Sequence, residues 1–196
     1  MEKPTRQRKS KTDLLKRGLE ILAGQGVEGV TIDALCTGLG VTKGSFYHHF
    51  KSRDQFHASL LEFWMEEHTE RKKALADEEG TPEQRYVRIV EYATTLPHEL
   101  EKNIRAWAMR NTLAADYLAK VDGSRIAYLE WLLKDILQDE TQARPMATIV
   151  LSTMIGSRLL SPPILGDARR ELLGQLHTLM GIQLPSATNS QKGAEQ

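Results

Sequence analysis

The sequence predicts an all-α protein of about nine helices. Apolar residues recur at three- and four-residue spacings along most of the 196 residues, and clusters of glycine and proline separate these segments. No segment shows the alternation typical of a β-strand. A content of 40% hydrophobic and 27% charged residues is ordinary for a globular chain long enough to bury a core.

The first helix is expected at about residues 12–23, because Leu15, Leu19 and Leu22 fall on one face. The glycines that follow should end it. A second, short helix is expected after Thr31, which is a good N-cap residue, and it should stop at the next pair of glycines.

A third short helix is expected after Thr42, with Phe46 and Phe50 facing the core at positions i and i+4. A fourth helix should begin at Ser52 or Asp54.

The rest of the chain also follows a helical pattern. A break at 78–80 precedes a strong start signal, Thr-Pro-Glu-Gln, at 81–84. A long helix over about 118–136 contains Asp-Gly at 122–123, which predicts a kink or a division there. The helix that starts at 81–84 carries Tyr86, Ile89, Val90 and Ala93 and is expected to run until Pro97. The other helices are expected at about 100–108, 145–160 and 167–181.

Two short helices joined by a tight glycine-containing turn, with a further helix packed behind, indicate a helix-turn-helix. In this arrangement the second helix of the pair contacts DNA bases from its N-terminal residues. Gly44 lies at that position, where glycine costs about 1 kcal/mol in a helix interior. We therefore expect this glycine to let the backbone approach DNA closely.

Charge is unevenly distributed, although Lys and Arg together equal Asp and Glu in number. Residues 1–56 carry ten basic and six acidic side chains, which indicates a contact with a polyanion. The basic residues before the first helix either add DNA contacts or form a solvated tail; they are Lys3, Arg6, Arg8, Lys9 and Lys11.

The segments 31–35 (TIDAL) and 39–54 (LGVTKGSFYHHFKSRD) together resemble the N-terminal DNA-binding domain of TetR-type (TetR/AcrR) transcriptional regulators. Tyr47, Phe50 and Lys51 occupy the positions of the family's Tyr-x-x-Phe-x-Lys signature. The resemblance covers about residues 10–58. Beyond them, only the length and the helical content are similar.

This resemblance implies a cytoplasmic homodimer that binds a palindromic operator, usually as a repressor, and that a small-molecule effector releases. It implies a DNA-binding domain at 1–55 and a regulatory and dimerisation domain at 56–183. Composition suggests that 184–196 form a disordered tail. The alternative is a DNA-binding regulator without a small ligand, controlled by a protein partner.

The resemblance also implies which residues contact DNA. Tyr47 and Lys51 match phosphate-contacting positions, and Thr31 matches a helix start that often does the same. Lys43, which can donate to guanine, belongs to the recognition positions. The predicted DNA-binding residues are Thr31, Thr42, Lys43, Gly44, Ser45, Tyr47, His48 and Lys51.

An effector pocket in a helical bundle would draw on large or soft side chains. The candidates are Trp64, Tyr92, Arg105, Trp107, Met109, Tyr128 and Met154. For each of them, plain core packing is the alternative interpretation. The segments 145–160 and 167–181 are expected to form the dimer interface, unless 145–160 is a buried central helix of the monomer.

Other classes of protein find little support. No segment is apolar enough to span a membrane, and no secretory signal is visible. Cys36 is the single cysteine, and the histidines lack metal-binding spacing, so no metal or cofactor is expected. The glycines at 38–44 fit neither phosphate-loop template, and no catalytic constellation appears, so the chain is not expected to be an enzyme.

Overall fold

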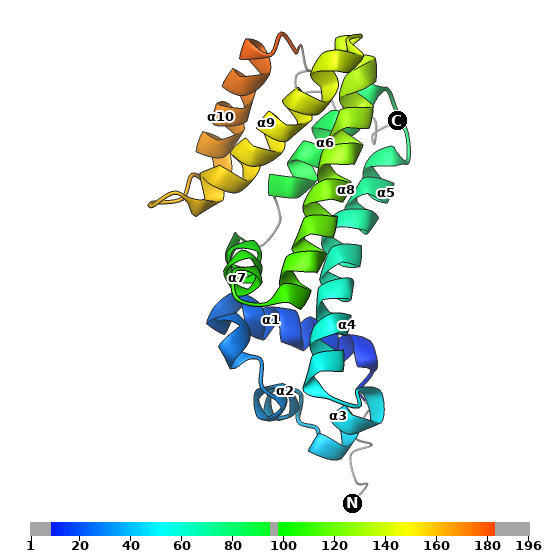
Figure 1. Cartoon of the computed structure of the whole chain (residues 1–196), viewed down its shortest axis with the longest axis vertical. Coiled ribbons are helices and arrows are strands. Elements are labelled where there is room, and N and C mark those ends of the chain that lie inside the picture. The colour runs from blue at the N-terminus through cyan, green and yellow to red at the C-terminus, as the bar shows by residue number, and fades with distance from the viewer. Residues whose placement is uncertain (1–8, 95–97, 183–196) are drawn as a thin grey trace, which may run out of the picture. The chain divides into compact units, whose positions relative to one another are not determined.

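The computed structural model describes residues 9–94 and 98–182, and all regular secondary structure in these residues is helical. The predicted all-α class is therefore confirmed (Figure 1). A five-residue π-helical segment, Glu66–Glu70, joins α4 to α5, so these form one continuous helix. The helices are α1 Lys11–Gly29, α2 Ile32–Leu39, α3 Lys43–His49, α4 Arg53–Met65, α5 Arg71–Asp77, α6 Pro82–Thr94, α7 His98–Ala108, α8 Thr112–Leu137, α9 Glu140–Leu159 and α10 Gly166–Leu179.

The chain divides into two compact units. The first comprises Met1–Thr69 and Pro97–Val121, and the second comprises Glu70–Leu96 and Asp122–Gln196. These units differ from the expected division at residues 55 and 56, because α4 and α7 pack against α1. The functional division into a DNA-binding and a regulatory domain remains a prediction.

The close contact between α1 and α4 depends on Gly18. A Cβ atom at this position would lie 2.8 Å from Phe56 Cζ and 2.9 Å from Leu60 Cδ1. Both distances are shorter than a van der Waals contact, so only glycine lets α4 approach α1 this closely. The contact completes the core around Leu14 and Leu22, which are fully buried.

The first helix is interrupted at its glycines, as expected. Gly26 has non-helical backbone angles with a left-handed φ of 69°, and a short helical segment follows this bend and ends at Gly29. The bend removes the intrahelical partners of preceding carbonyl groups. Asn103 on α7 replaces them, since its Nδ2 donates to Leu22 O at 2.9 Å and to Ala23 O at 3.0 Å.

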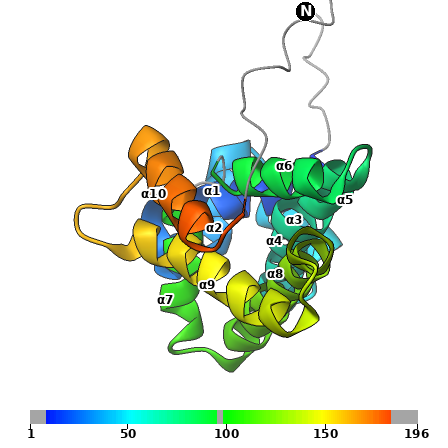
Figure 2. The same ribbon diagram turned by 90° about the horizontal axis from the view of Figure 1, so that it is seen from above.

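The second unit has its own hydrophobic core, formed by α6, α9, α10 and the C-terminal half of α8. Tyr86, Leu133 and Val150 are fully buried there. Within this unit α10 lies beside α9, as both views of the ribbon show (Figure 1, Figure 2). Tyr86 on α6 and His177 on α10 form a buried hydrogen bond of 2.9 Å between Oη and Nε2.

Two predicted features of the C-terminal half are wrong. Helix α8 is unbroken through Asp122 and Gly123, because an isolated glycine lowers helix stability without ending the helix. Helix α9 begins before Pro145, at Glu140, because Asp139 caps its N-terminus by accepting from Thr141 N at 2.9 Å. Pro145 lies in the second turn.

Among the described residues, no helix is both long and apolar enough to cross a membrane.

Candidate nucleic-acid interface

The turn between α2 and α3 is held by hydrogen bonds to the backbone. Thr31 caps α2, and its Oγ1 accepts from Ala34 N at 3.1 Å. At the other end of α2, Gly40 adopts a left-handed φ of 65°, and Val41 N donates to Cys36 O at 2.9 Å. Because a left-handed residue reverses the chain in this way, α3 can start three residues after Gly40, at Lys43.

Three phenylalanines pack α3 against the rest of the first unit. Phe46, Phe50 and Phe56 are almost completely buried, which confirms the expected core positions of Phe46 and Phe50. The ring centroids of Phe46 and Phe56 are 5.5 Å apart, and those of Phe50 and Phe56 are 4.9 Å apart. This aromatic cluster packs the buried side of α3 against the core and leaves the opposite side of the helix exposed.

The opposite side of α3 carries most of the predicted DNA-binding residues. Thr42 caps α3, with its Oγ1 accepting from Ser45 N at 3.3 Å. Tyr47 is 52% exposed, and its ring packs edge-on against Phe46 at 5.5 Å. Ser45 is half-buried, and the others are exposed: Thr31, Thr42, Lys43, Gly44, Tyr47, His48 and Lys51.

Lys43 forms an ion pair that sequence reasoning missed. Its Nζ lies 2.7 Å from Asp33 Oδ1, and both side chains are exposed. The hydrogen bond that Lys43 donates to Asp33, together with the negative charge of Asp33, raises the pKa of Lys43. The only signal in the sequence was an acidic residue in the first turn of α2, and spacing alone does not show that it reaches α3. This ion pair must open before Lys43 Nζ can bind another acceptor.

Gly44 is not required by packing inside the protein. A Cβ atom there would have Thr42 Oγ1 at 3.6 Å as its nearest neighbour, which is an ordinary contact. Its φ also lies outside the left-handed region. The glycine therefore leaves space on the exposed side of α3.

Lys51 precedes a well-capped helix. Ser52 Oγ accepts from Gln55 N at 3.1 Å, and Lys51 N donates to Gln55 Oε1 at 2.6 Å, so α4 begins with a reciprocal cap. This cap fixes the backbone of Lys51 at the N-terminus of α4, where the helix dipole attracts anions. The arrangement suits a phosphate contact.

The described end of the basic segment, Lys9 and Lys11, lies beside His49 and Phe50 at the end of α3. His49 Nε2 lies 3.3 Å from Lys9 O, and Lys11 Nζ lies 5.6 Å from the centre of the Phe50 ring. The other basic residues of this segment, Lys3, Arg6 and Arg8, lie outside the described residues.

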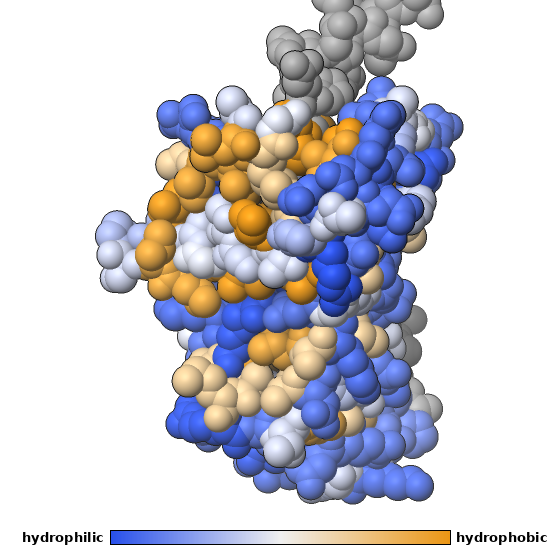
Figure 3. All heavy atoms as spheres, turned by 45° about the horizontal axis from the view of Figure 1, so that its top comes forward, coloured by the Kyte–Doolittle hydropathy of each residue, from blue (hydrophilic) through white to orange (hydrophobic). Residues whose placement is uncertain are grey.

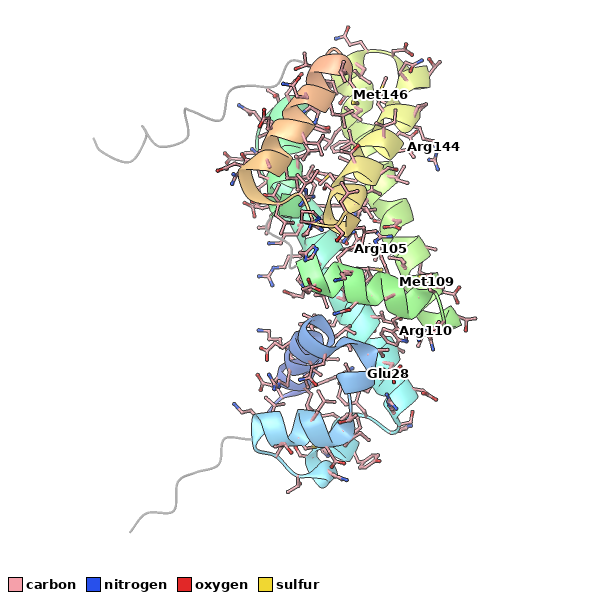
Figure 4. All side chains as sticks on the ribbon, turned by 90° about the vertical axis from the view of Figure 1, so that its left-hand side faces the viewer. Glu28, Arg105, Met109, Arg110, Arg144 and Met146 are labelled. Atoms are coloured by element: carbon pink, nitrogen blue, oxygen red, sulfur yellow. The ribbon has the colours of Figure 1, made fainter. Side chains whose placement is uncertain are left out.

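The candidate effector residues are divided between the two units. In the first unit, Trp64 and Trp107 are buried, Arg105 pairs with Glu101 at 2.8 Å, and Met109 is 87% exposed at the end of α7 (Figure 4).

In the second unit the three remaining candidates differ in their environment. Tyr128 Oη donates to Asp77 Oδ1 at 2.7 Å, and Asp77 and burial together raise the pKa of Tyr128. Tyr92 is half-buried and lies under the ammonium of Lys72 at 5.2 Å. Met154 is buried in the core.

A surface pocket of about 330 Å³ lies within the first unit, and Trp107 is the one candidate that lines it. The His57 ring packs edge-on against Trp107 at 5.0 Å, and burial lowers the pKa of His57. Glu28 and Arg110 belong to its lining and are labelled in Figure 4. The lining residues are Val27, Glu28, Arg53, Asp54, His57, Trp107, Arg110 and Asn111.

Residues 10–60 match the family model described as bacterial regulatory proteins of the tetR family. A curated relative, the transcriptional regulator AcuR of Cereibacter sphaeroides, is 39% identical over 49 residues, which are 25% of this chain. The match spans 22% of the length of AcuR.

Solved structures with this fold cover most of the chain. The reduced form of NemR from E. coli has a TM-score of 0.73 at 20% identity, covering 90% of this chain and 99% of NemR. A transcriptional regulator from Rhodococcus sp. RHA1 has a TM-score of 0.71 at 20% identity, covering 91% of this chain and 100% of that protein. A regulator from Saccharomonospora viridis, solved with choline, has a TM-score of 0.73 at 15% identity, covering 87% and 95%.

Proposed function

We propose that this chain, whose N-terminal DNA-binding domain belongs to the tetR family of bacterial regulatory proteins, represses transcription by binding a palindromic operator as a homodimer. A small-molecule effector releases it. It acts in the cytoplasm and has no catalytic role. The observation that carries this proposal is the exposed face of α3, which the buried phenylalanines hold outward.

On DNA, α3 enters the major groove with its N-terminal end. Lys43 leaves Asp33 and donates to a guanine, while Ser45 and His48 read neighbouring base edges. Tyr47, Lys51 and the cap residues Thr31 and Thr42 hold phosphates and fix the register. Gly44 allows the close approach of backbone and DNA.

The homodimer forms through α9 and α10. Several apolar side chains of these helices and of the loop between them are exposed, and Figure 3 shows apolar surface gathered on this part of the second unit. An isologous interface would cover this surface and pair two DNA-binding domains. The exposed apolar residues are Ile149, Leu159, Leu160, Leu165 and Leu179.

The effector acts by a population shift. It binds in the second unit and favours a spacing of the two α3 helices that no longer matches half-sites about 34–36 Å apart. A typical coupling of about 1–3 kcal/mol weakens operator binding about 5–150-fold. The choline bound to the Saccharomonospora viridis regulator supports a small ligand at this fold. A second candidate function is a regulator without a small ligand, which a protein partner controls, since the candidate residues are divided between the two units.

The test is selection of bound sequences from random duplex DNA, with the affinity measured against salt concentration. An enriched inverted repeat with a steep salt dependence supports the proposal, because phosphate contacts release counterions. Binding without sequence preference contradicts it. Adding candidate metabolites to the selected operator complex then separates the two modes of control.

A further inference from the structure

Two arginines are buried in the second unit. Arg158, near the C-terminus of α9, is 5% exposed, and Arg169, in the first turn of α10, is 2% exposed. Removing a guanidinium from water costs several kcal/mol unless a partner compensates its charge. These residues therefore need an explanation that an exposed arginine does not.

The described partners of Arg169 carry no net charge. Its Nη2 donates to Met154 O at 3.3 Å, which is a long hydrogen bond, and its Nε has no hydrogen-bond partner. Within residues 9–94 and 98–182, no carboxylate lies within ion-pair distance of Arg169. Burial and the nearby charge of Arg158 lower the pKa of Arg169 to about 10.

Arg158 adds a second positive charge to the same place. Its guanidinium donates through Nη2 to Ala93 O at the end of α6. The charge of Arg158 disfavours the charged form of Arg169, and the hydrogen bond from Arg169 to Met154 O offsets only part of this cost. The neighbouring residue behaves differently, since Arg170 is exposed and pairs with Asp167.

We propose that Arg169, with Arg158 beside it, binds the carboxylate or phosphate group of a small organic anion. A guanidinium presents a planar fork of donors that matches these groups, and an anion would neutralise the buried charge of Arg169. The surrounding core contains Met154 and Leu173, which suits the apolar remainder of an organic acid. The role of this anion as the effector rests on the proposed function. The existence of the binding site does not depend on it.

The test compares Arg169→Met with Arg170→Met as the matched control, using thermal melting of the full chain. Without added anion, Arg169→Met should melt at or above the wild-type temperature, since it removes an uncompensated charge. Met154 O would keep a partner, because Ser157 Oγ also donates to it at 3.2 Å. A destabilisation of Arg169→Met by several degrees relative to Arg170→Met overturns the proposal.

The second arm adds sodium acetate, sodium benzoate or sodium phosphate, each against sodium chloride of equal ionic strength. At 100 times its dissociation constant, a bound anion should raise the melting temperature of wild type and Arg170→Met by about 5–10 °C. Arg169→Met should not respond. Which probe acts distinguishes a carboxylate from a phosphate ligand. The same response in all three proteins, or in none, overturns the proposal.

Operator binding is measured separately in the presence of the active anion. If an anion binds through Arg169 but leaves operator affinity unchanged, the anion-binding site is supported. The site is then not the effector site. Failure to select any operator without anion contradicts the proposed function and leaves the site unaffected. A change of dimerisation in Arg169→Met without an anion response means that a second copy supplies the missing carboxylate, and this also overturns the proposal.

Discussion

At the scale of single residues, α3 carries two kinds of side chain: buried residues that pack it against the core, and exposed residues that contribute nothing to the core. Phe46 and Phe50 are buried and hold the helix, whereas Lys43 and Gly44 have no structural task in the core. Lys43 Nζ lies 2.7 Å from Asp33 Oδ1 in an exposed ion pair. Substitutions on this face should therefore change DNA binding more than stability.

Lys43→Ala should alter sequence preference, with a loss of about 1–3 kcal/mol on the preferred operator and little loss on unrelated DNA. Lys51→Ala should weaken binding to all sequences and lower the slope of log K against log salt by about 1. Salt titrations with the selected operator and with an unrelated duplex measure both effects. A uniform loss in Lys43→Ala would show that this lysine does not contact a base.

Gly44→Ala should keep or raise stability, by up to about 1 kcal/mol, because alanine favours a helix and the added Cβ fits. It should nevertheless weaken operator binding, since the methyl group occupies space between α3 and DNA. The matched control is Gly123→Ala in α8, where a Cβ would meet nothing within 4 Å. Equal operator affinity in the two variants would contradict the close approach at Gly44.

At the scale of elements, each unit depends on a few close or polar contacts between helices. In the first unit, α4 reaches α1 at Gly18, and Asn103 on α7 satisfies the carbonyls that the bend in α1 leaves free. In the second unit, the Tyr86–His177 hydrogen bond joins α6 to α10. These contacts determine how the helices pack, whereas caps determine where the helices begin.

Gly18→Ala should lower the free energy of unfolding by about 1–3 kcal/mol, because the new methyl group overlaps Phe56 and Leu60. Gly24→Ala in the same helix is the control, since its Cβ would meet nothing within 4 Å. Gly24→Ala should be neutral or stabilising by up to about 1 kcal/mol. Urea unfolding of both variants measures the difference, and equal stabilities would mean that α1 and α4 can move apart without cost.

Stability should decrease as the pH falls below about 6.5, the ordinary pKa of histidine. Burial lowers the pKa of His177 in the folded state, so the unfolded chain takes up the proton first. The loss is at most about 1.4 kcal/mol per pH unit for this one proton. Melting temperatures between pH 7.5 and 5.5 measure it.

In the same pH series, His177→Gln should lose less stability on acidification than wild type does. His48→Gln, at an exposed position of α3, should behave as wild type does. His57 contributes a dependence of the same sign, because burial lowers its pKa too, so part of the effect should remain in His177→Gln. An unchanged dependence in His177→Gln would assign the whole effect to other groups.

At the scale of the whole molecule, the two units suggest a division of tasks. The first unit holds the helix-turn-helix with its own core, and the second holds α9, α10 and the buried arginines. A regulator of the proposed kind needs both, because one half-site contact alone gives weak, poorly selective binding. Dimerisation should therefore control operator affinity.

Ile149→Glu should shift the protein toward monomers and weaken operator binding without unfolding it. Ile149 is 44% exposed on α9, so the carboxylate disturbs the proposed interface more than the core. Met109→Glu, at an exposed apolar residue of the first unit, is the control and should remain dimeric. Analytical ultracentrifugation measures the association, and a dimeric Ile149→Glu would place the interface elsewhere.

The sequence by itself determined the all-α class, the short helices α2 and α3 with their threonine caps, and the inward positions of Phe46 and Phe50. These features depend on interactions between residues a few positions apart, so local patterns are sufficient to predict them.

Only the tertiary structure decided which distant residues meet. It paired Lys43 with Asp33, placed Asn103 under the bend in α1, divided the effector candidates between two units and buried Arg158 and Arg169 together. It also showed that α8 continues through Gly123, since the cost of one glycine is small compared with the packing of a long helix. Contacts across long separations depend on how the helices pack, and the periodicity of a single helix carries no information about its neighbour.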